Sequence, residues 1–212
     1  RLAHLRTVLQ TEHLDGFVVP HTDAHQGEYV AARDARLAWL TGFTGSAGFC
    51  AVLIDRAGVF VDGRYRVQVK QQVDDCFTPV DWPETGLADW LLAQQPRPGK
   101  IGFDPWLHTI LELQNLRKML AGQIELVAMS DNLIDRIWID QPPLPNRTID
   151  AYPVEYAGES ATSKRMRCGE ALAQSGHDSV FLNQTDSIAW LLNIRGSDIP
   201  RVPVALCFAL LH

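Results

Sequence analysis

The sequence has no long apolar run. None of its hydrophobic stretches approaches the roughly 20 residues that a membrane-spanning helix needs, and residues 1–6 lack the apolar segment of a secretory signal peptide. We therefore expect a cytoplasmic protein that makes no contact with a membrane.

Cysteine is scarce, with four residues in 212. They are Cys50, Cys76, Cys168 and Cys207. No two of them form a Cys-x-x-Cys pair, and their spacing matches no zinc-binding pattern. Isolated thiols in apolar surroundings predict four buried core residues of a protein in a reducing compartment.

Positive charge is also limited. The 19 Lys and Arg residues are scattered against 25 Asp and Glu residues, which gives a formal net charge of −6. A nucleic-acid-binding protein normally carries a basic stripe, so we expect no nucleic-acid partner. Hydrophobic residues make up 46% of the chain and charged residues 21%, which is the balance of a folded globular protein.

Short strands and helices alternate along the first 140 residues. Strands are expected at 17–19, 49–54, 59–61, 77–80, 101–103 and 124–127, and helices at 1–11, 35–40, 65–73, 87–95, 109–120 and 132–138. The turn at 55–58 predicts a β-hairpin. Asp62 is expected to cap the helix after it, and Pro96 to end the helix that begins at residue 87. The pattern predicts an α/β fold with a mixed β-sheet flanked by helices.

Prolines divide the chain after this domain. The segment 141–146 contains Pro142, Pro143 and Pro145, which are incompatible with a regular helix or a central strand. We predict an amino-terminal α/β domain at 1–140, an irregular Pro-rich linker at 141–163, and a second domain that begins at 164 and continues to 212.

The order of motifs near the start of the chain recurs after the linker. A helix at 164–175 and the segment 178–182, which mirrors 15–19, are followed by Thr-Asp, Ala-Trp-Leu and Gly-Ser, in the order found within the first 46 residues. Residues 203–206 are expected to form the next strand, in the place of 49–52. The second copy lacks a counterpart of the hairpin's second strand, so we expect a truncated copy of the same fold.

Two segments resemble ligand sites. The sequence His21-x-Asp23-x-His25 could hold a metal, because alternate side chains on an extended segment point the same way. A fourth ligand has no obvious candidate nearby, and a polar loop held by hydrogen bonds explains the same residues. The glycines of 42–48 could cradle a phosphate, but their spacing is not that of a phosphate-binding loop, and we expect a tight loop in which backbone lies close to backbone.

Arg64 is the candidate binding residue. It lies in the Asp-Gly-Arg-Tyr motif of residues 62–65, between an expected strand and an expected helix, where loops at a sheet edge carry binding groups. Its planar fork could hold a peptide carbonyl or carboxylate, or it could pair with a neighbouring acid on the surface. Ser46 and Ser197 lack the context of a catalytic serine, so no catalytic residue is assigned.

Several motifs follow one another in a family-specific order along nearly the whole chain. They are Asp23-Ala24-His25-Gln26-Gly27-Glu28-Tyr29, residues 40–48, Val61-Asp62-Gly63-Arg64-Tyr65, residues 132–138 and residues 186–200. Together they resemble the amino-terminal region of Xaa-Pro aminopeptidases (aminopeptidase P, in the creatinase/aminopeptidase P family), most of all its larger, three-domain cytosolic branch.

This resemblance implies two related α/β domains followed by a catalytic domain of the pita-bread fold. That catalytic domain binds two divalent metal ions, usually manganese, through two Asp, one His and two Glu, and the enzyme cleaves the peptide bond before a proline in second position. None of the residues of this chain matches those ligands, so we expect it to bind no metal. In this family the Arg of the Asp-Gly-Arg-Tyr motif is thought to reach toward the bound peptide, which implies substrate binding by Arg64.

The resemblance also implies a role for the chain. It would be the non-catalytic amino-terminal part of the enzyme, inactive alone, supporting substrate access and homodimerisation, with its own catalytic domain and a peptide with penultimate proline as partners. The alternative is a stand-alone binding or assembly module with no attached hydrolase. A creatinase-like amidinohydrolase or a prolidase is disfavoured by the second copy after residue 164, because those relatives usually have a single amino-terminal domain.

Overall fold

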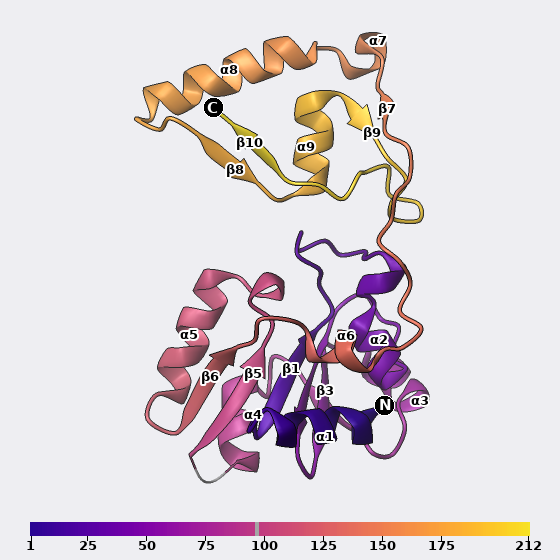
Figure 1. Ribbon diagram of the computed structural model, residues 1–212, viewed down its shortest axis with the longest axis vertical. Helices are drawn as coiled ribbons and strands as arrows, with labels where there is room; N and C mark the ends of the chain where they lie inside the picture. The colour runs from indigo at the N-terminus through magenta and orange to yellow at the C-terminus, as the bar shows by residue number, and fades with distance from the viewer. Residues whose placement is uncertain (96–97) are drawn as a thin grey trace. The chain divides into compact units, whose positions relative to one another are not determined.

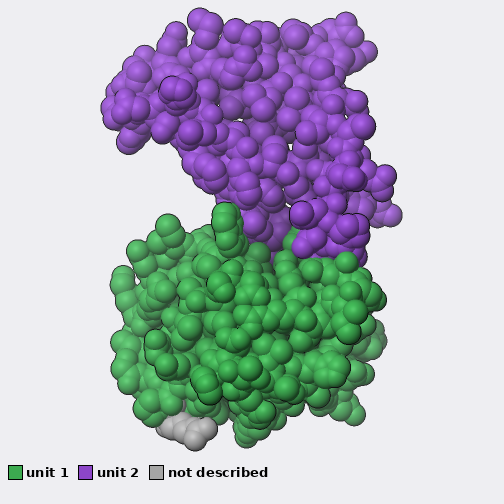
Figure 2. Space-filling model, viewed as in Figure 1, with its two compact units in different colours: residues 1–21, 34–141 green, residues 22–33, 142–212 purple. Residues whose placement is uncertain are grey.

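A computed structural model describes residues 1–95 and 98–212 (Figure 1). The chain forms two compact units, one made of residues 1–21 and 34–141 and the other of residues 22–33 and 142–212 (Figure 2). The short segment 22–33 therefore belongs by its contacts to the second unit, although the sequence on both sides of it builds the first. Among the described residues, no helix is long and apolar enough to cross a membrane.

The first unit is built on a six-stranded mixed sheet. Its strands are β1 (Gly16–Pro20), β2 (Phe49–Leu53), β3 (Ala57–Val61), β4 (Thr78–Asp81), β5 (Gly99–Phe103) and β6 (Ile124–Ala128). They lie in the order β4-β3-β2-β1-β5-β6, and β2 is antiparallel to both of its neighbours while the other pairs are parallel. The predicted hairpin is confirmed. Because β2 alone among these six runs the other way, the carboxyl ends of the other five strands lie at one edge of the sheet.

Helices cover both faces of this sheet (Figure 1). They are α1 (Leu2–Thr11), α2 (Arg36–Thr41), α3 (Arg66–Gln72), α4 (Leu87–Gln94), α5 (Ile110–Leu120) and α6 (Leu133–Ile137), with short 3-10 turns η1 (Ala32–Asp34) and η2 (Pro105–Leu107). α1, α2, α3 and α6 pack on one face, and α4 and α5 pack on the other. The predicted α/β fold with a mixed sheet flanked by helices is confirmed. Pro96, the expected end of the fourth helix, lies outside the described residues.

Strand β1 shows why the sheet is buried on both faces. Phe17 and Val19 belong to the core cluster of α1 and α6, whereas Val18 between them belongs to the cluster of α4 and α5. Successive residues of a strand point to opposite faces, so a continuous apolar run satisfies both layers. Helix α1 needs only one apolar face, and it buries Leu2, Leu5 and Leu9 at helical spacing.

The cysteines differ in their burial. Cys50 is buried in β2, but Cys76 is exposed, and Cys168 and Cys207 are half-buried. The expectation of four buried thiols is therefore wrong for three of them. Cys76 lies in the turn before β4, between the exposed Asp75 and the buried Phe77.

The second unit has smaller elements. They are β7 (Asp150–Ala151), α7 (Val154–Ala157), α8 (Ala161–Gln174), β8 (Val180–Leu182), α9 (Thr185–Leu192), β9 (Ile194–Arg195) and β10 (Ala209–Leu211). β8 pairs with β10 and β7 pairs with β9, both antiparallel. The expectation of an irregular chain as far as residue 163 is wrong, because β7, α7 and the first turn of α8 precede that point. The hydroxyl of Ser160 accepts a hydrogen bond from the backbone N–H of Ser163 and caps α8 three residues earlier than expected.

The repeated order of elements is present, but one register was placed wrongly. α8, β8, α9 and β10 follow one another as α1, β1, α2 and β2 do in the first unit, and each strand pair is antiparallel. The partner strand of β8 is residues 209–211, not 203–206. Pro203 has no N–H for a strand ladder, and the N–H of Leu206 donates instead to the Asp198 carboxylate at 2.8 Å.

A buried lysine joins α8 to α9. Lys164 is 2% exposed, and its Nζ donates to the Trp190 carbonyl at 2.9 Å and to Asn193 Oδ1 at 2.7 Å. The ammonium also lies 4.6 Å from the centroid of the Trp190 ring. The carbonyl groups at the end of a helix lack intrahelical partners, and the lysine satisfies one of them.

Candidate functional site

The residues that follow the parallel strands lie together at the carboxyl edge of the first unit's sheet. Asp62 follows β3, Trp82 follows β4 and Asp104 follows β5. In open α/β sheets, ligands bind outside the carboxyl ends of the strands. Arg64 comes two residues after Asp62 and therefore stands at the edge where this architecture places its ligands.

Asp62 holds Arg64 at this edge. Asp62 Oδ1 accepts hydrogen bonds from the backbone N–H of Arg64 at 2.9 Å and from its Nε at 3.1 Å, and Oδ2 accepts from Nη2 at 2.7 Å. The hydrogen bonds from the Arg64 side chain hold the pKa of Asp62 below its ordinary value. The expectation that Asp62 caps α3 is wrong, because its carboxylate closes an Asx turn onto Arg64 and the residue before α3 is Tyr65, which makes no side-chain cap.

The Arg64 side chain is both paired and accessible. It is 62% exposed, whereas the side chain of Asp62 is 20% exposed. The guanidinium carbon lies 5.2 Å from the centroid of the Tyr65 ring. Pairing with a neighbouring acid, one of the two alternatives for Arg64, is therefore present in the structure, and the Arg64 side chain as a whole stays largely exposed.

Tyr65 connects this turn to the glycine-rich loop. Its hydroxyl lies 2.8 Å from Ser46 Oγ, and its ring meets the Phe43 ring edge-on at 5.6 Å. Ser46 and Phe43 both belong to the loop 42–48. The loop 42–48 therefore packs against Tyr65, the residue that follows Arg64.

Two of the three glycines of this loop, Gly42 and Gly48, lie against backbone, and Gly45 lies against the Phe43 ring. Gly42 has φ +82°, and a Cβ there would lie 2.9 Å from the Gln72 carbonyl oxygen. A Cβ on Gly48 would lie 2.7 Å from the Phe60 carbonyl oxygen. The N–H of Thr44 donates to Gln72 Oε1 at 3.0 Å. The loop is the tight backbone crossing that we expected, and β2 rather than a helix follows it.

A second arginine, Arg66, directly follows the motif and has a different environment. Arg66 lies 3.2 Å through Nε from Asp81 Oδ1 and donates through Nη2 to Glu84. Both carboxylates belong to β4 and the turn after it, so Arg66 ties α3 to the neighbouring strand. Its side chain is 38% exposed, less than that of Arg64.

The residues of the His-x-Asp-x-His sequence take separate partners. The N–H of His21 donates to the Gly48 carbonyl at 3.1 Å in the first unit. Asp23 is 2% exposed, and its Oδ1 accepts from the N–H of His25 at 2.9 Å. His25 Nδ1 lies 2.8 Å from the Asn183 carbonyl, and its ring stacks on that of Phe208 at 4.6 Å. Asp23 and His25 thus hold the segment 22–33 in the second unit. Within residues 1–95 and 98–212, no three His, Cys, Asp or Glu side chains are placed to bind a metal ion.

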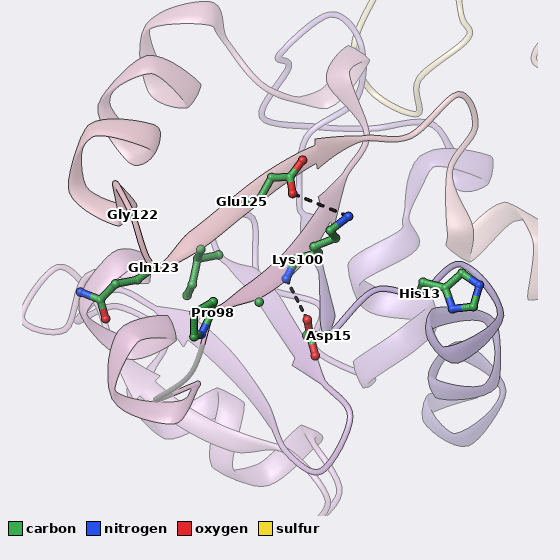
Figure 3. A pocket seen from close by; sticks show the side chains of 9 residues that line it. His13, Asp15, Pro98, Lys100, Gly122, Gln123 and Glu125 are labelled. Carbon is green, nitrogen blue, oxygen red and sulfur yellow. Dashed lines mark hydrogen bonds and ion pairs between the residues drawn. The ribbon is translucent and has the colours of Figure 1, made fainter.

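A hollow of about 550 Å³ lies at the other edge of the sheet, around the amino ends of β5 and β6 (Figure 3). Its polar groups bind one another: Asp15 Oδ2 accepts from the N–H of Lys100 at 2.8 Å, and Lys100 Nζ lies 3.7 Å from Glu125 Oε2. Ligands of open α/β sheets bind at the opposite edge. We therefore assign no function to this hollow.

Two contacts of the site are not predicted from the sequence: the hydrogen bonds between Asp62 and Arg64 and the contact between Ser46 and Tyr65. Asp62 was assigned to a helix end rather than to Arg64, and Ser46 was considered only as a nucleophile. An Asp two residues before a polar residue, directly after a strand, is the pattern of an Asx turn and is visible in the sequence. The Ser46–Tyr65 contact joins residues from two loops, and no local pattern indicates it.

Comparison with known proteins places the chain in a family. Two models described as Creatinase/Prolidase N-terminal domain match it, one over residues 1–137 and one over residues 140–212. Human Xaa-Pro aminopeptidase 2 is 36% identical over 99% of this chain and 32% of its own length. The probable Xaa-Pro aminopeptidase P of Coccidioides posadasii (strain C735) is also 36% identical, over 99% of this chain and 33% of its own. The chain spans about a third of the length of these relatives.

Solved structures give the same result. An X-prolyl aminopeptidase of Caenorhabditis elegans, described as a cytosolic enzyme with a di-nuclear active site, matches with a TM-score of 0.93 and 33% identity over 99% of this chain and 36% of its own. The N-terminal domain of the cytoplasmic peptidase PepQ from Mycobacterium tuberculosis matches with a TM-score of 0.51 and 25% identity, over 64% of this chain and 96% of its own. From its family-model matches and its α/β fold, this chain belongs to the creatinase/prolidase N-terminal domain family.

Proposed function

We propose that this chain is the non-catalytic amino-terminal part of a Xaa-Pro aminopeptidase, a metal-dependent hydrolase that removes the first residue from peptides with proline in second position. The observation that carries the proposal is the 36% identity to human Xaa-Pro aminopeptidase 2 over 99% of the chain. The catalytic activity belongs to the whole protein, and we expect the 212-residue chain alone to be inactive.

Within that protein, residues 1–140 supply most of a first α/β domain, and the prolines of 141–146 connect it to a second α/β domain that contains β7, α7 and α8. The support for a second domain of the same kind is the order α8, β8, α9, β10, which repeats α1, β1, α2, β2 with the same antiparallel pairing. A separate catalytic domain of the pita-bread fold completes the protein.

Two divalent metal ions, with manganese as the proposed identity, belong to that catalytic domain. The described part of this chain brings together no set of three His, Cys, Asp or Glu side chains, and its donor residues do not fit such a site. The metal would supply the polarisation of the scissile carbonyl and the nucleophilic water. The proposed task of this chain is to support substrate access to that site, with Arg64 in contact with the peptide.

Arg64 is the residue proposed to contact the peptide. A proline nitrogen carries no hydrogen, so a peptide with penultimate proline offers mostly carbonyl and carboxylate acceptors near the bond to be cut. A guanidinium carries only donors, in a planar fork that fits such acceptors. Arg64 supplies this group at the carboxyl edge of the sheet, with its side chain 62% exposed.

The test is steady-state kinetics of the full-length, manganese-loaded protein with an X–Pro peptide. We expect Arg64→Ala to raise KM at least about tenfold, the effect of losing a hydrogen bond from a charged group. Arg56→Ala is the matched control, because Arg56 is also an exposed arginine paired with an adjacent aspartate, at 52% exposure, and lies in the turn before β3 at the other edge. Equal KM values for Arg64→Ala and Arg56→Ala would contradict the proposal that Arg64 contacts the peptide. A full-length protein with no X–Pro cleavage would favour the stand-alone module.

We also propose that the whole protein is a cytoplasmic homodimer. The Caenorhabditis elegans protein, described as cytosolic, supports the location. Sedimentation of the full-length protein tests the assembly, and a single monomeric species across micromolar concentrations would contradict it.

A further inference from the structure

We propose that Asp62 is a positioning residue that sets the direction in which the Arg64 guanidinium meets a bound peptide. This inference rests on the proposed function of Arg64. Asp62 itself does not contact the peptide in this account; it acts through the arginine.

The carboxylate grips Arg64 at three points. One oxygen takes both the backbone N–H and Nε of Arg64, at 2.9 Å and 3.1 Å, and the other takes Nη2 at 2.7 Å. A single acid therefore fixes the turn of the backbone and the plane of the guanidinium together. An arginine side chain otherwise samples many rotamers, and the grip removes most of that freedom before any ligand arrives.

The base of this grip is rigid. Asp62 follows Val61, the last residue of β3, which is 0% exposed and part of the core. Gly63, the residue between the acid and the arginine, has no atom within 4 Å of the position a Cβ would take. The turn therefore starts from a fixed strand end and has open space beside Gly63, and the Tyr65 ring near the Arg64 guanidinium is itself held by the contact of its hydroxyl with Ser46.

The other arginines near the sheet are held in different ways. Arg56 makes one contact with Asp55 through Nε at 3.3 Å, and Asp55 is 68% exposed, which is an ordinary surface pair. Arg66 is held by acids of a neighbouring strand and the turn after it, so its pair serves to join α3 to β4. Asp62 is the less exposed acid, at 20%, and it binds an arginine whose own side chain reaches solvent. A largely buried acid that holds an exposed arginine is suited to orient a binding group, because the acid fixes the side chain while the arginine stays accessible to a ligand.

Charge and geometry predict how Asp62→Asn behaves. The asparagine keeps one oxygen for the backbone N–H of Arg64, so the turn is preserved. Its amide nitrogen cannot accept from Nη2, so the two-oxygen grip on the guanidinium is lost. The variant therefore frees the side chain and leaves the fold in place.

The experiment is a double-mutant cycle in the full-length, manganese-loaded protein with an X–Pro peptide. We expect Asp62→Asn to raise KM about threefold to tenfold while kcat stays within about twofold, because the arginine is still present but no longer oriented. Asp62→Glu is expected to recover part of the loss. In an Arg64→Ala background, Asp62→Asn should change KM no further, because the acid acts only through the arginine. Asp55→Asn, the matched control, should behave as the parent protein.

A second measurement tests the orientation directly. In NMR spectra of the 212-residue chain, the Nε–H of Arg64 should give a resolved, slowly exchanging signal that Asp62→Asn abolishes and Asp55→Asn leaves unchanged. Parent-like KM for Asp62→Asn, or an effect that persists in the Arg64→Ala background, would overturn the inference. If Arg64→Ala itself leaves KM unchanged, the proposed function of Arg64 fails first, and the two failures are distinguishable.

Discussion

The Asp135 carboxylate holds the Arg36 guanidinium through two parallel hydrogen bonds, at 2.7 Å from Nε and 2.9 Å from Nη2. Arg36 opens α2 and Asp135 lies in α6, so the pair joins two helices on one face of the sheet. Arg36 is 6% exposed. Burial acts to lower the pKa of its guanidinium, but the hydrogen bonds and charges of Asp135 and Asp34 outweigh this effect, and the pKa stands above its ordinary value.

Removing one partner of this pair should destabilise the first unit. We expect Asp135→Ala to lower the free energy of unfolding by about 2–3 kcal/mol, toward the low end for a buried pair because the Asp135 side chain is 29% exposed. Urea unfolding of the 212-residue chain measures this. Asp55→Ala, which breaks an exposed pair, should leave the urea midpoint unchanged. Equal midpoints for the two variants would contradict the role assigned to Arg36 and Asp135.

Two glycines with nearly the same positive φ distinguish the cost of a left-handed backbone from the cost of a steric clash at Cβ. Gly42 has φ +82° and Gly122 has φ +80°, but a Cβ would meet the Gln72 carbonyl oxygen at 2.9 Å in the first case and nothing within 4 Å in the second. We expect Gly122→Ala to cost about 1 kcal/mol, the price of a left-handed residue with a side chain. Gly42→Ala should cost clearly more, because the loop must also move. The melting temperatures of the two variants check the order, and a reversed order would contradict the close approach in the loop 42–48.

The thiols should differ in reactivity. Burial raises the pKa of the Cys50 thiol, and the side chain lies in the core, whereas Cys76 is exposed. The thiolate is the reactive form, so iodoacetamide at neutral pH should label Cys76 first and Cys50 only after unfolding. Peptide mass spectrometry at timed points reads the order, with the same reaction in urea as the control. Early labelling of Cys50 in the folded chain would contradict its place in β2.

The Asp62–Arg64 contact should be lost in acid. Because hydrogen bonds from Arg64 lower the pKa of Asp62 from its ordinary value of 3.8, the folded carboxylate stays charged to a lower pH than the unfolded one. Its contribution to stability is thus fully present above pH 3.8 and is lost as the pH falls through the lower, folded value. Carboxyl carbon chemical shifts followed by NMR should give a midpoint for Asp62 below 3.8, and Arg64→Ala should return it to the ordinary value. An unchanged midpoint in that variant would contradict the assignment.

Local sequence patterns predicted the layers of the first unit better than they predicted its contacts. The short apolar run Phe17, Val18 and Val19, which ends at Pro20, favours a strand that is buried on both faces. The turn at 55–58 lies between two β-rich runs and predicts a hairpin. The role of Asp62 depended on where α3 begins, and a shift of that helix start by a residue or two changes a helix cap into an Asx turn. Arg64 could be placed at a sheet edge from the sequence, but the hydrogen bonds from three of its nitrogen atoms to one carboxylate could not.

The second unit was harder for a physical reason. Its small core contains Ala189, Ile199 and Val204. Within residues 196–208, the Leu206 N–H donates to the Asp198 carboxylate and the Asp198 N–H donates to the Val204 carbonyl, in place of the hydrogen bonds of a β-strand pair. Pattern matching to the first copy therefore placed the next strand too early. The Asn183 carbonyl that contacts His25 lies 158 residues further along the chain, and no local rule reaches that far.

The segment 22–33 has a consequence for how such chains can be rearranged. It is an arm of the first stretch of sequence that folds with the second unit, so the chain passes between the units at 21–22, at 33–34 and at 141–142. The boundary between the two family-model matches, at residues 137–140, therefore does not coincide with the division into two compact units, because residues 22–33 lie before it and belong to the second unit. A chain divided at that boundary would separate His25 from Phe208 and from the Asn183 carbonyl, and the second unit would lack the segment 22–33.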